Sequence, residues 1–198
     1  MSTQDNGREK RQIEMFGLKS KSRNNRGCKY LPDAELTIDG RTYNFELKSG
    51  SKNSFSTARG FSAEKIEEWK KNDFFIFSQF DSKDRAQPFI KHVICQPESL
   101  KFFFEKVTDA VNTKGHAGKI GLSEWDKDIK PLLKGLPSEF LQRVEKTVKV
   151  GAQYNDPKIS LKKIIEHGGH VLDNEKPLKE QLVKFIQTQK NTGVYNGK

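Results

Sequence analysis

The chain has 198 residues, which is enough for one domain with a sizeable core and room for a subdomain. Its 36 Lys and Arg residues against 26 Asp and Glu residues give a net charge of +10, which favours a polyanionic partner such as nucleic acid. No long apolar run or signal-peptide core occurs, and the two cysteines lack paired spacing, so a membrane span, secretion, a disulfide framework and a zinc site are not indicated. We therefore expect a cytoplasmic protein with no membrane partner.

The N-terminal segment, where we expect the first helix, is strongly basic. Residues 8–29 contain eight Lys and Arg residues against Glu9 and Glu14, a net charge of +6. Such a segment can run along a DNA backbone, although a solvated N-terminus explains the same charge. Residues 17–30 carry only a poor strand signal.

Residues 32–48 have the pattern of a β-hairpin. Asp39 and Gly40 lie between two runs of strand-forming residues and suit a two-residue turn in which both positions have positive φ. This turn predicts that Ile38 pairs with Arg41, which sets the register of the whole hairpin.

In this register Asp33 lies directly across from Glu46, about 5 Å away. Alternation along the two strands gathers the polar residues on one face: Asp33, Glu35, Thr37, Thr42, Asn44, Glu46 and Lys48. The apolar residues form the other face: Ala34, Leu36, Ile38, Tyr43, Phe45 and Leu47. Two facing carboxylates can hold Mg²⁺, which favours oxygen ligands, and a nearby ammonium can orient a metal-bound water or stabilise charge on a phosphate.

The residues Pro32-Asp33 and Glu46-Leu47-Lys48 resemble the motif of the PD-(D/E)XK nuclease superfamily, to which many type II restriction endonucleases belong. The resemblance covers the hairpin and, more loosely, the elements up to about residue 95. It implies an α/β fold with a restriction-endonuclease-like mixed central sheet flanked by helices. It also implies that Asp33, Glu46 and the Leu47 carbonyl bind Mg²⁺, that Lys48 positions the attacking water, and that hydrolysis leaves 5′-phosphate and 3′-hydroxyl ends.

The motif is weak when taken without its context. An acid two residues before a lysine recurs at Glu68, Asp81, Asp128 and Asp156, so a solvated polar hairpin face remains an alternative. The strand pattern, the turn and the facing acid separate Glu46 from these four positions.

Two further questions about acids stay open at this point. Glu35 could be a further ligand, a partner of a ligand or a solvated glutamate. Enzymes of this superfamily can also use an acid from the N-terminal helix, for which Glu9 or Glu14 could serve. They usually have a strand before the first acid, which this sequence indicates poorly.

Three more elements follow the hairpin in the expected core. Residues 49–60 are predicted as a polar loop, and a short helix is expected from the N-cap Ser62 to Lys71. Phe74–Phe80 is apolar on both faces, as in a buried central strand, and Phe89–Cys95 is another strand. After Pro97 the apolar residues have helical spacing: Leu100, Phe103, Phe104, Val107 and Val111.

A polar, Gly-rich connection from Asn112 to Gly121 divides the chain into a predicted catalytic core, residues 1–112, and a mostly helical basic subdomain, residues 113–198, with a possible role in DNA recognition. Four helices are expected there, near Ser123–Leu133, Ser138–Val148, Ser160–His167 and Asn174–Gln189. The last two could form a DNA-binding helix-turn-helix or a helical cap on the sheet. Two glycines separate His167 from His170 and argue against a zinc site.

These observations predict a Mg²⁺-dependent endonuclease that cleaves double-stranded DNA at a specific sequence, as type II restriction enzymes do. We expect a two-fold homodimer on a palindromic site and a cognate DNA methyltransferase in the same system. One alternative is a structure-specific enzyme, such as a junction resolvase or a repair or phage nuclease. Another is a non-catalytic basic DNA-binding protein, in which facing acids would repel the phosphates unless a cation lay between them.

Overall fold

The computed structural model describes residues 3–21, 32–57, 63–114, 125–148 and 157–191. Its contacts divide the chain into two compact units. The first comprises Met1–Ser56, Glu68–Lys101 and Lys158–Lys198, and the second comprises Thr57–Glu67 and Phe102–Pro157. Among the described residues, no helix is long and apolar enough to cross a membrane.

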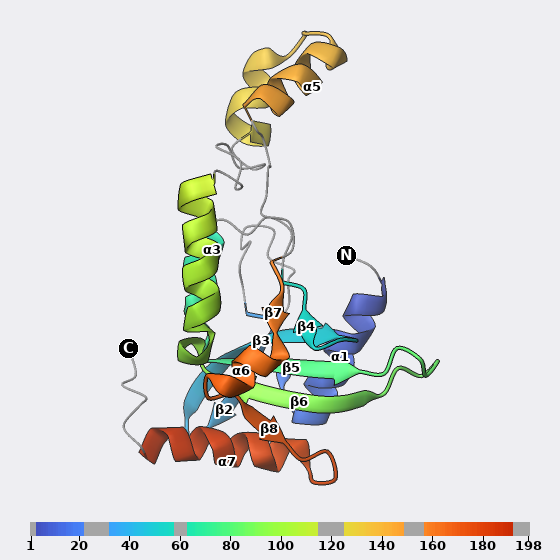
Figure 1. The fold of residues 1–198 in the computed structure, drawn as a ribbon, viewed down its shortest axis with the longest axis vertical. Helices are drawn as coiled ribbons and strands as arrows, with labels where there is room; N and C mark the ends of the chain where they lie inside the picture. Colours follow the sequence, from blue (N-terminus) through green and yellow to red (C-terminus); the bar gives the residue numbers. More distant parts are fainter. Residues whose placement is uncertain (1–2, 22–31, 58–62, 115–124, 149–156, 192–198) are drawn as a thin grey trace. The chain divides into compact units, whose positions relative to one another are not determined.

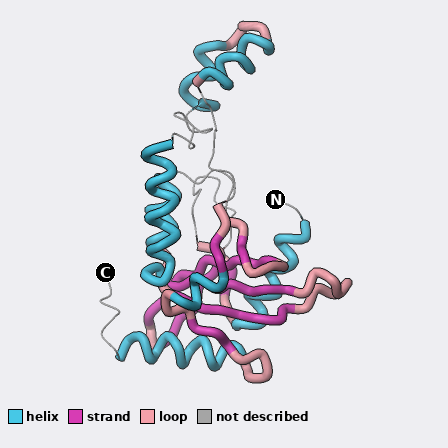
Figure 2. The backbone as a smooth tube through the Cα atoms, viewed as in Figure 1, coloured by secondary structure: helices cyan, strands magenta, loops and turns pink. Residues whose placement is uncertain are grey.

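A six-stranded mixed sheet forms the centre of the first unit (Figures 1 and 2). The strands are β1 (Lys19–Ser20), β2 (Ala34–Ile38), β3 (Arg41–Gly50), β5 (Phe74–Phe80), β6 (Phe89–Cys95) and β8 (His170–Leu172), and they lie in the order β1-β2-β3-β5-β6-β8. Strands β3 and β5 are parallel, and every other neighbouring pair is antiparallel. Together with its flanking helices, this sheet confirms a mixed α/β class.

The predicted hairpin register is confirmed. Ile38 pairs with Arg41, and the same register continues to the pair Ala34 and Phe45 at the far end of the hairpin. The turn residues Asp39 and Gly40 have φ values of 50° and 76°, the left-handed conformation that a two-residue hairpin turn requires. The short strand β1 pairs with β2 and precedes the first acid, although its sequence signal is poor.

Strand β5 is buried along both faces, as its apolar sequence predicts. On one face, Phe74 and Ile76 join a core that helices α1 (Thr3–Phe16) and α7 (Leu178–Asn191) cover. The core residues on this side of the sheet are Phe16, Leu18, Ala34, Ile38, Tyr43, Phe45, Leu47, Phe74, Ile76, Ile94, Leu172, Leu178, Leu182 and Ile186. This packing is possible because apolar residues recur every three to four positions along α7.

Smaller elements of the first unit lie over the opposite face. Strands β4 (Ser54–Phe55) and β7 (Ile159–Ser160) pair with each other, and Phe55 of β4 meets the ring of Phe77 at 5.2 Å. Helix α6 (Leu161–Glu166) follows directly, with the Ser160 side chain accepting a hydrogen bond from its first turn.

The end of the chain belongs to the sheet unit rather than to a separate region. Strand β8 extends the sheet beside β6, and α7 packs into the core. This grouping differs from the predicted division after residue 112. The helix-turn-helix alternative is excluded, because β8 separates α6 from α7 and pairs with the sheet, whereas α7 packs on the sheet as the alternative of a helical cap expects.

The second unit holds α3 (Lys101–Lys114), the short turns of residues 125–133 and α5 (Ser138–Thr147). The buried residues Phe103, Phe104 and Val107 confirm the predicted helix after Pro97, which begins with a 3₁₀ turn at Pro97–Leu100 in the first unit. Around Pro131 the structure has a π turn and a 3₁₀ turn in place of one continuous helix. Helix α2 (Ala63–Lys70) crosses between the units, and its predicted N-cap Ser62 lies outside the described residues, as does most of the predicted connection, residues 115–121.

Candidate active site

Asp33 lies just before β2 and Glu46 lies on β3, and both are buried, with exposed fractions of 6% and 8%. The backbone N–H of Asp33 donates to the carbonyl of Phe45 at 3.0 Å, so the first acid is held against β3 just before β2 begins. Its carboxylate atom Oδ2 accepts a hydrogen bond from the backbone N–H of Leu47 at 2.9 Å. These two bonds orient the Asp33 carboxylate toward the strand that carries Glu46.

The Lys48 ammonium lies among the three oxygen ligands that the motif predicts. Its Nζ is 2.6 Å from Oε1 of Glu46 and 3.0 Å from the carbonyl oxygen of Leu47. Oδ2 of Asp33 is 3.7 Å away. The hairpin therefore brings two carboxylates and one carbonyl around a single positive charge. This all-oxygen donor set fits a hard divalent cation such as Mg²⁺.

Burial and the nearby carboxylates act in opposite directions on the pKa of Lys48. Burial by itself would lower the pKa of this ammonium, but the carboxylates of Glu46 and Asp33 outweigh burial and raise the pKa above its usual value. Glu9 on α1 contributes in the same direction. Lys48 is therefore protonated at physiological pH and neutralises part of the acidic charge.

The two acids of the N-terminal helix α1 differ in their relation to Lys48. The charge of Glu9 acts on Lys48, whereas the Glu14 side chain is 61% exposed and pairs with Lys10 on the helix surface. Within the described parts of the chain, no group of three or more His, Cys, Asp or Glu side chains is arranged to hold a metal.

Glu35 belongs to a different interaction. Its carboxylate pairs with Lys21 at 3.2 Å and with Lys19 at 3.5 Å, and the Lys21 ammonium also donates to Oδ1 of Asn44 at 2.7 Å. The hydrogen bond from Lys21 and the charges of both lysines hold the pKa of Glu35 below its usual value. Glu35 therefore links β1 to the hairpin as an ion-pair partner.

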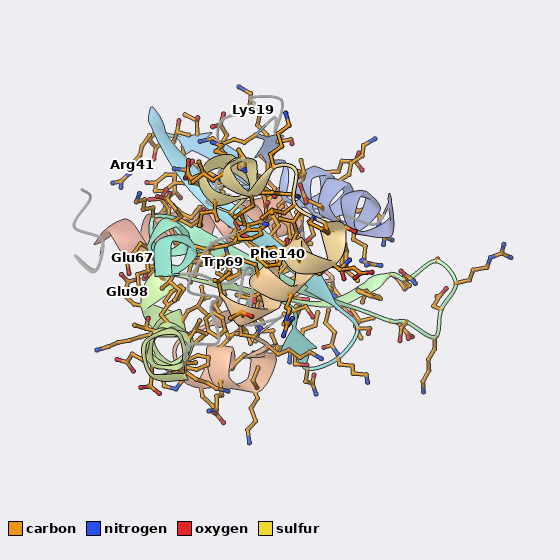
Figure 3. The ribbon with its side chains drawn as sticks, turned by 90° about the horizontal axis from the view of Figure 1, so that it is seen from above. Lys19, Arg41, Glu67, Trp69, Glu98 and Phe140 are labelled. Atoms are coloured by element: carbon orange, nitrogen blue, oxygen red, sulfur yellow. The ribbon has the colours of Figure 1, made fainter. Side chains whose placement is uncertain are left out.

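The sequence analysis missed the aromatic contact of Lys48. Trp69, in the last turn of α2, places its ring centroid 5.0 Å from Nζ of Lys48 and is only 3% exposed (labelled in Figure 3). Its spacing from Ile66 on a short amphipathic helix indicated an ordinary core residue. The sequence carries no other signal for this contact, because residues 48 and 69 lie on different elements.

A second missed residue supports the site from the opposite face of the sheet. Gln12 of α1 is buried, and its Nε2 donates to the backbone carbonyl of Lys48 at 3.3 Å and to Oγ of Ser78 at 2.7 Å. The signal for Gln12 was available, because it lies four residues before the buried Phe16 and so faces the core of an amphipathic helix.

Ser78 continues this polar network to His92, whose Nδ1 is 2.8 Å from the serine hydroxyl. His92 is fully buried against Phe16, and its Nε2 has no hydrogen-bond partner among the described residues. Burial lowers the pKa of His92 to about 4, so the ring is neutral at physiological pH. His92 therefore has a structural role in the sheet.

A comparison with models of known protein families finds no match for this chain, and a search of curated proteins finds none either. The interpretation of the site therefore depends on its own geometry and chemistry.

Proposed function

We propose that this protein is a Mg²⁺-dependent DNA endonuclease of the PD-(D/E)XK type. The observation that carries the proposal is the convergence of Glu46 Oε1, the Leu47 carbonyl and Asp33 Oδ2 on the ammonium of Lys48. Two carboxylates and a carbonyl that face one cation are a donor set that can also hold a divalent metal, and a bound metal is what metal-assisted phosphodiester hydrolysis needs. The order of hairpin, helix, parallel strand and antiparallel strand supports a restriction-endonuclease-like fold.

The roles follow from the position of each group. Asp33, Glu46 and the Leu47 carbonyl would hold Mg²⁺, which supplies charge stabilisation at a phosphate and activation of a water. Lys48 would leave its carboxylate partners and donate hydrogen bonds to the attacking water or to a phosphate oxygen. The hydrogen bond from Leu47 N–H keeps the Asp33 carboxylate oriented throughout.

Double-stranded DNA is the substrate we propose, because the net charge of +10 favours a polyanion. Lys48 neutralises only one of the two buried acids, and the remaining negative charge would repel a phosphate, so we propose that the site accepts a nucleic acid together with its metal. For a sequence-specific enzyme we further propose a two-fold homodimer on a palindromic site and a cognate methyltransferase that protects host DNA.

A structure-specific nuclease is the second candidate, and the C-terminal segment favours it. A chain that continues for 86 residues after residue 112 would by its length favour sequence-specific recognition, because reading bases needs additional protein. However, β8 and α7 are built into the sheet unit, so less of this chain is available for base recognition.

The test incubates the purified protein with long unmethylated duplexes and with four-way junctions, in Mg²⁺ and in EDTA. Glu46→Gln and Lys48→Met should abolish cleavage. Glu35→Gln is the matched control, because Glu35 lies on the same hairpin face but pairs with Lys19 and Lys21. Discrete fragments from the duplex support a restriction enzyme, and cleavage of junctions alone supports the structure-specific enzyme. Intact binding without metal-dependent cleavage of either substrate would refute the proposal and leave a DNA-binding protein.

A further inference from the structure

Lys48 makes one contact that neither its charge pairing nor the motif explains. Its Nζ lies over the ring of Trp69, 5.0 Å from the ring centroid, within the range in which an aromatic face attracts a cation. The carboxylates of Glu46 and Asp33 hold the same ammonium. Lys48 is therefore shared between an acidic pair and an aromatic face.

The surrounding structure holds the Trp69 ring in place. The ring packs on Phe75 of β5 with centroids 5.7 Å apart. At the end of α2, the backbone N–H and the side-chain amide of Asn72 both donate to the carbonyl of Trp69 at 3.1 Å. This closes the last turn of the helix and fixes the path of the chain after Trp69.

The next residue connects that turn to the strand of the candidate site. Asp73 N–H donates to the carbonyl of Asn44 at 3.0 Å, and Asp73 Oδ2 accepts from the N–H of Asn44 at 2.7 Å. Asn44 precedes Glu46 by two residues on β3. The position of Trp69 is thus tied to the strand that carries both Glu46 and Lys48.

We propose that Trp69 is a positioning residue. It holds the Lys48 ammonium beside Asp33 and Glu46, and it keeps the ammonium in the site when a divalent cation occupies the ammonium's position among the oxygens. This proposal rests on the nuclease function for its effect on rate, but the contact itself does not depend on that function. An aromatic face compensates a cation for lost hydration without offering it a charged partner. Lys48 can therefore exchange its carboxylate contacts for a substrate phosphate or water while remaining in the site.

To test the proposal, the charge distribution of the Trp69 ring is changed with almost no change in the shape of the ring. The chain has two tryptophans, so Trp125→Phe leaves Trp69 alone to be replaced by tryptophan carrying one, two or three ring fluorines. Each fluorine weakens the negative face of the ring. The single-turnover cleavage rate in saturating Mg²⁺ should fall stepwise, by between about 2-fold and about 30-fold over the series.

Trp125 supplies the matched control, since it is equally buried but lies in the second unit. In a Trp69→Phe background, fluorination of Trp125 should leave the rate unchanged. If the Trp125→Phe variant does not fold, the protein that carries fluorinated tryptophan at both Trp69 and Trp125 is compared with the control that carries it at Trp125 alone. A rate that is constant across the Trp69 series, in a protein that Lys48→Met inactivates, overturns the proposal.

A measurement independent of activity tests the contact itself. The ¹⁹F resonance of fluorinated Trp69 should shift in the Lys48→Met variant, which removes the charge over the ring. In the labelled protein that keeps Lys48, it should also shift when Mg²⁺ is added. If the protein cleaves no DNA, the proposed function fails, and the resonance still decides whether Trp69 holds Lys48. A resonance that Lys48→Met does not move overturns the proposal whatever the activity.

Discussion

Oδ2 of Asp33 accepts a hydrogen bond from the backbone N–H of Leu47 at 2.9 Å. One acid of the hairpin is thereby fixed to the strand segment that carries the other acid, the candidate carbonyl ligand and the lysine. A change at Asp33 that removes this acceptor should therefore affect the stability of the hairpin, whereas one that removes only the charge should affect the site.

The variant Asp33→Asn tests this double role. Asparagine keeps an oxygen that can accept from Leu47, but it removes one negative charge from the metal ligands. We expect a thermal midpoint close to that of the unsubstituted protein and a cleavage rate at least about 100-fold lower. Steady-state cleavage and thermal unfolding measure the two effects. Full activity in Asp33→Asn would exclude a metal-binding role for this carboxylate.

Lys48→Met removes the cation that neutralises the buried acids. Without Mg²⁺, the buried carboxylates of Asp33 and Glu46 lose the positive charge of Lys48, which should lower the free energy of unfolding by up to about 3 kcal/mol. Mg²⁺ should restore part of this loss, because a cation that binds only the folded state stabilises it. Urea unfolding with and without Mg²⁺ measures both quantities.

Lys71→Met is the matched control for that measurement. Its Nζ is also 2.6 Å from a carboxylate, that of Glu68, but the lysine side chain is 69% exposed. This substitution should cost less than about 1 kcal/mol and should not respond to Mg²⁺. An equal Mg²⁺ response in both variants would mean that the cation binds elsewhere.

Gln12→Met removes the donor that reaches Lys48 and Ser78 from α1. The Ser78 hydroxyl is buried and the bond to the Lys48 carbonyl is partly buried, so the variant should lose about 1–3 kcal/mol of unfolding free energy. Glu14→Gln, on the exposed side of the same helix, should change it by less than about 0.5 kcal/mol. Denaturant unfolding compares them, and a Gln12→Met protein as stable as the control would show that the network contributes nothing.

Because His92 is buried, the free energy of unfolding of the protein should depend on pH. Its pKa is lowered from 6.5 to about 4 in the folded protein, so between these values the unfolded chain binds the proton more readily. The contribution of neutral His92 is fully present above pH 6.5 and is lost as the pH falls toward 4, on the order of 3 kcal/mol in all. His92→Gln should flatten this part of the stability curve. An unchanged slope in the variant would assign the pH dependence to carboxylates.

Local chemistry explains which features of the fold could be predicted. Asp39 and Gly40 determine the turn, and the turn determines that Asp33 faces Glu46, so the register follows from neighbouring residues alone. Strand β8 could not be predicted, because its three residues between Gly169 and Asp173 are too few for alternation to be visible.

Contacts between distant elements could not be predicted from the sequence, for a different reason. The spacing of Leu178, Leu182 and Ile186 predicts an amphipathic helix, but it does not say that this helix packs on the sheet of the first unit. Likewise, the motif predicts that Lys48 lies near Glu46, while its contact with Trp69 depends on where α2 ends. Contacts between distant elements arise from packing that periodicity does not encode.

Anomalous scattering from a crystal of the protein soaked in Mn²⁺ shows directly whether the hairpin acids hold a divalent cation. We expect a peak bonded to oxygens of Asp33, Glu46 and the Leu47 carbonyl at roughly 2.0–2.2 Å, with Nζ of Lys48 moved out of that position. A crystal in which Lys48 keeps its contact with Glu46 and no peak lies beside these oxygens would show that the hairpin acids hold no such cation.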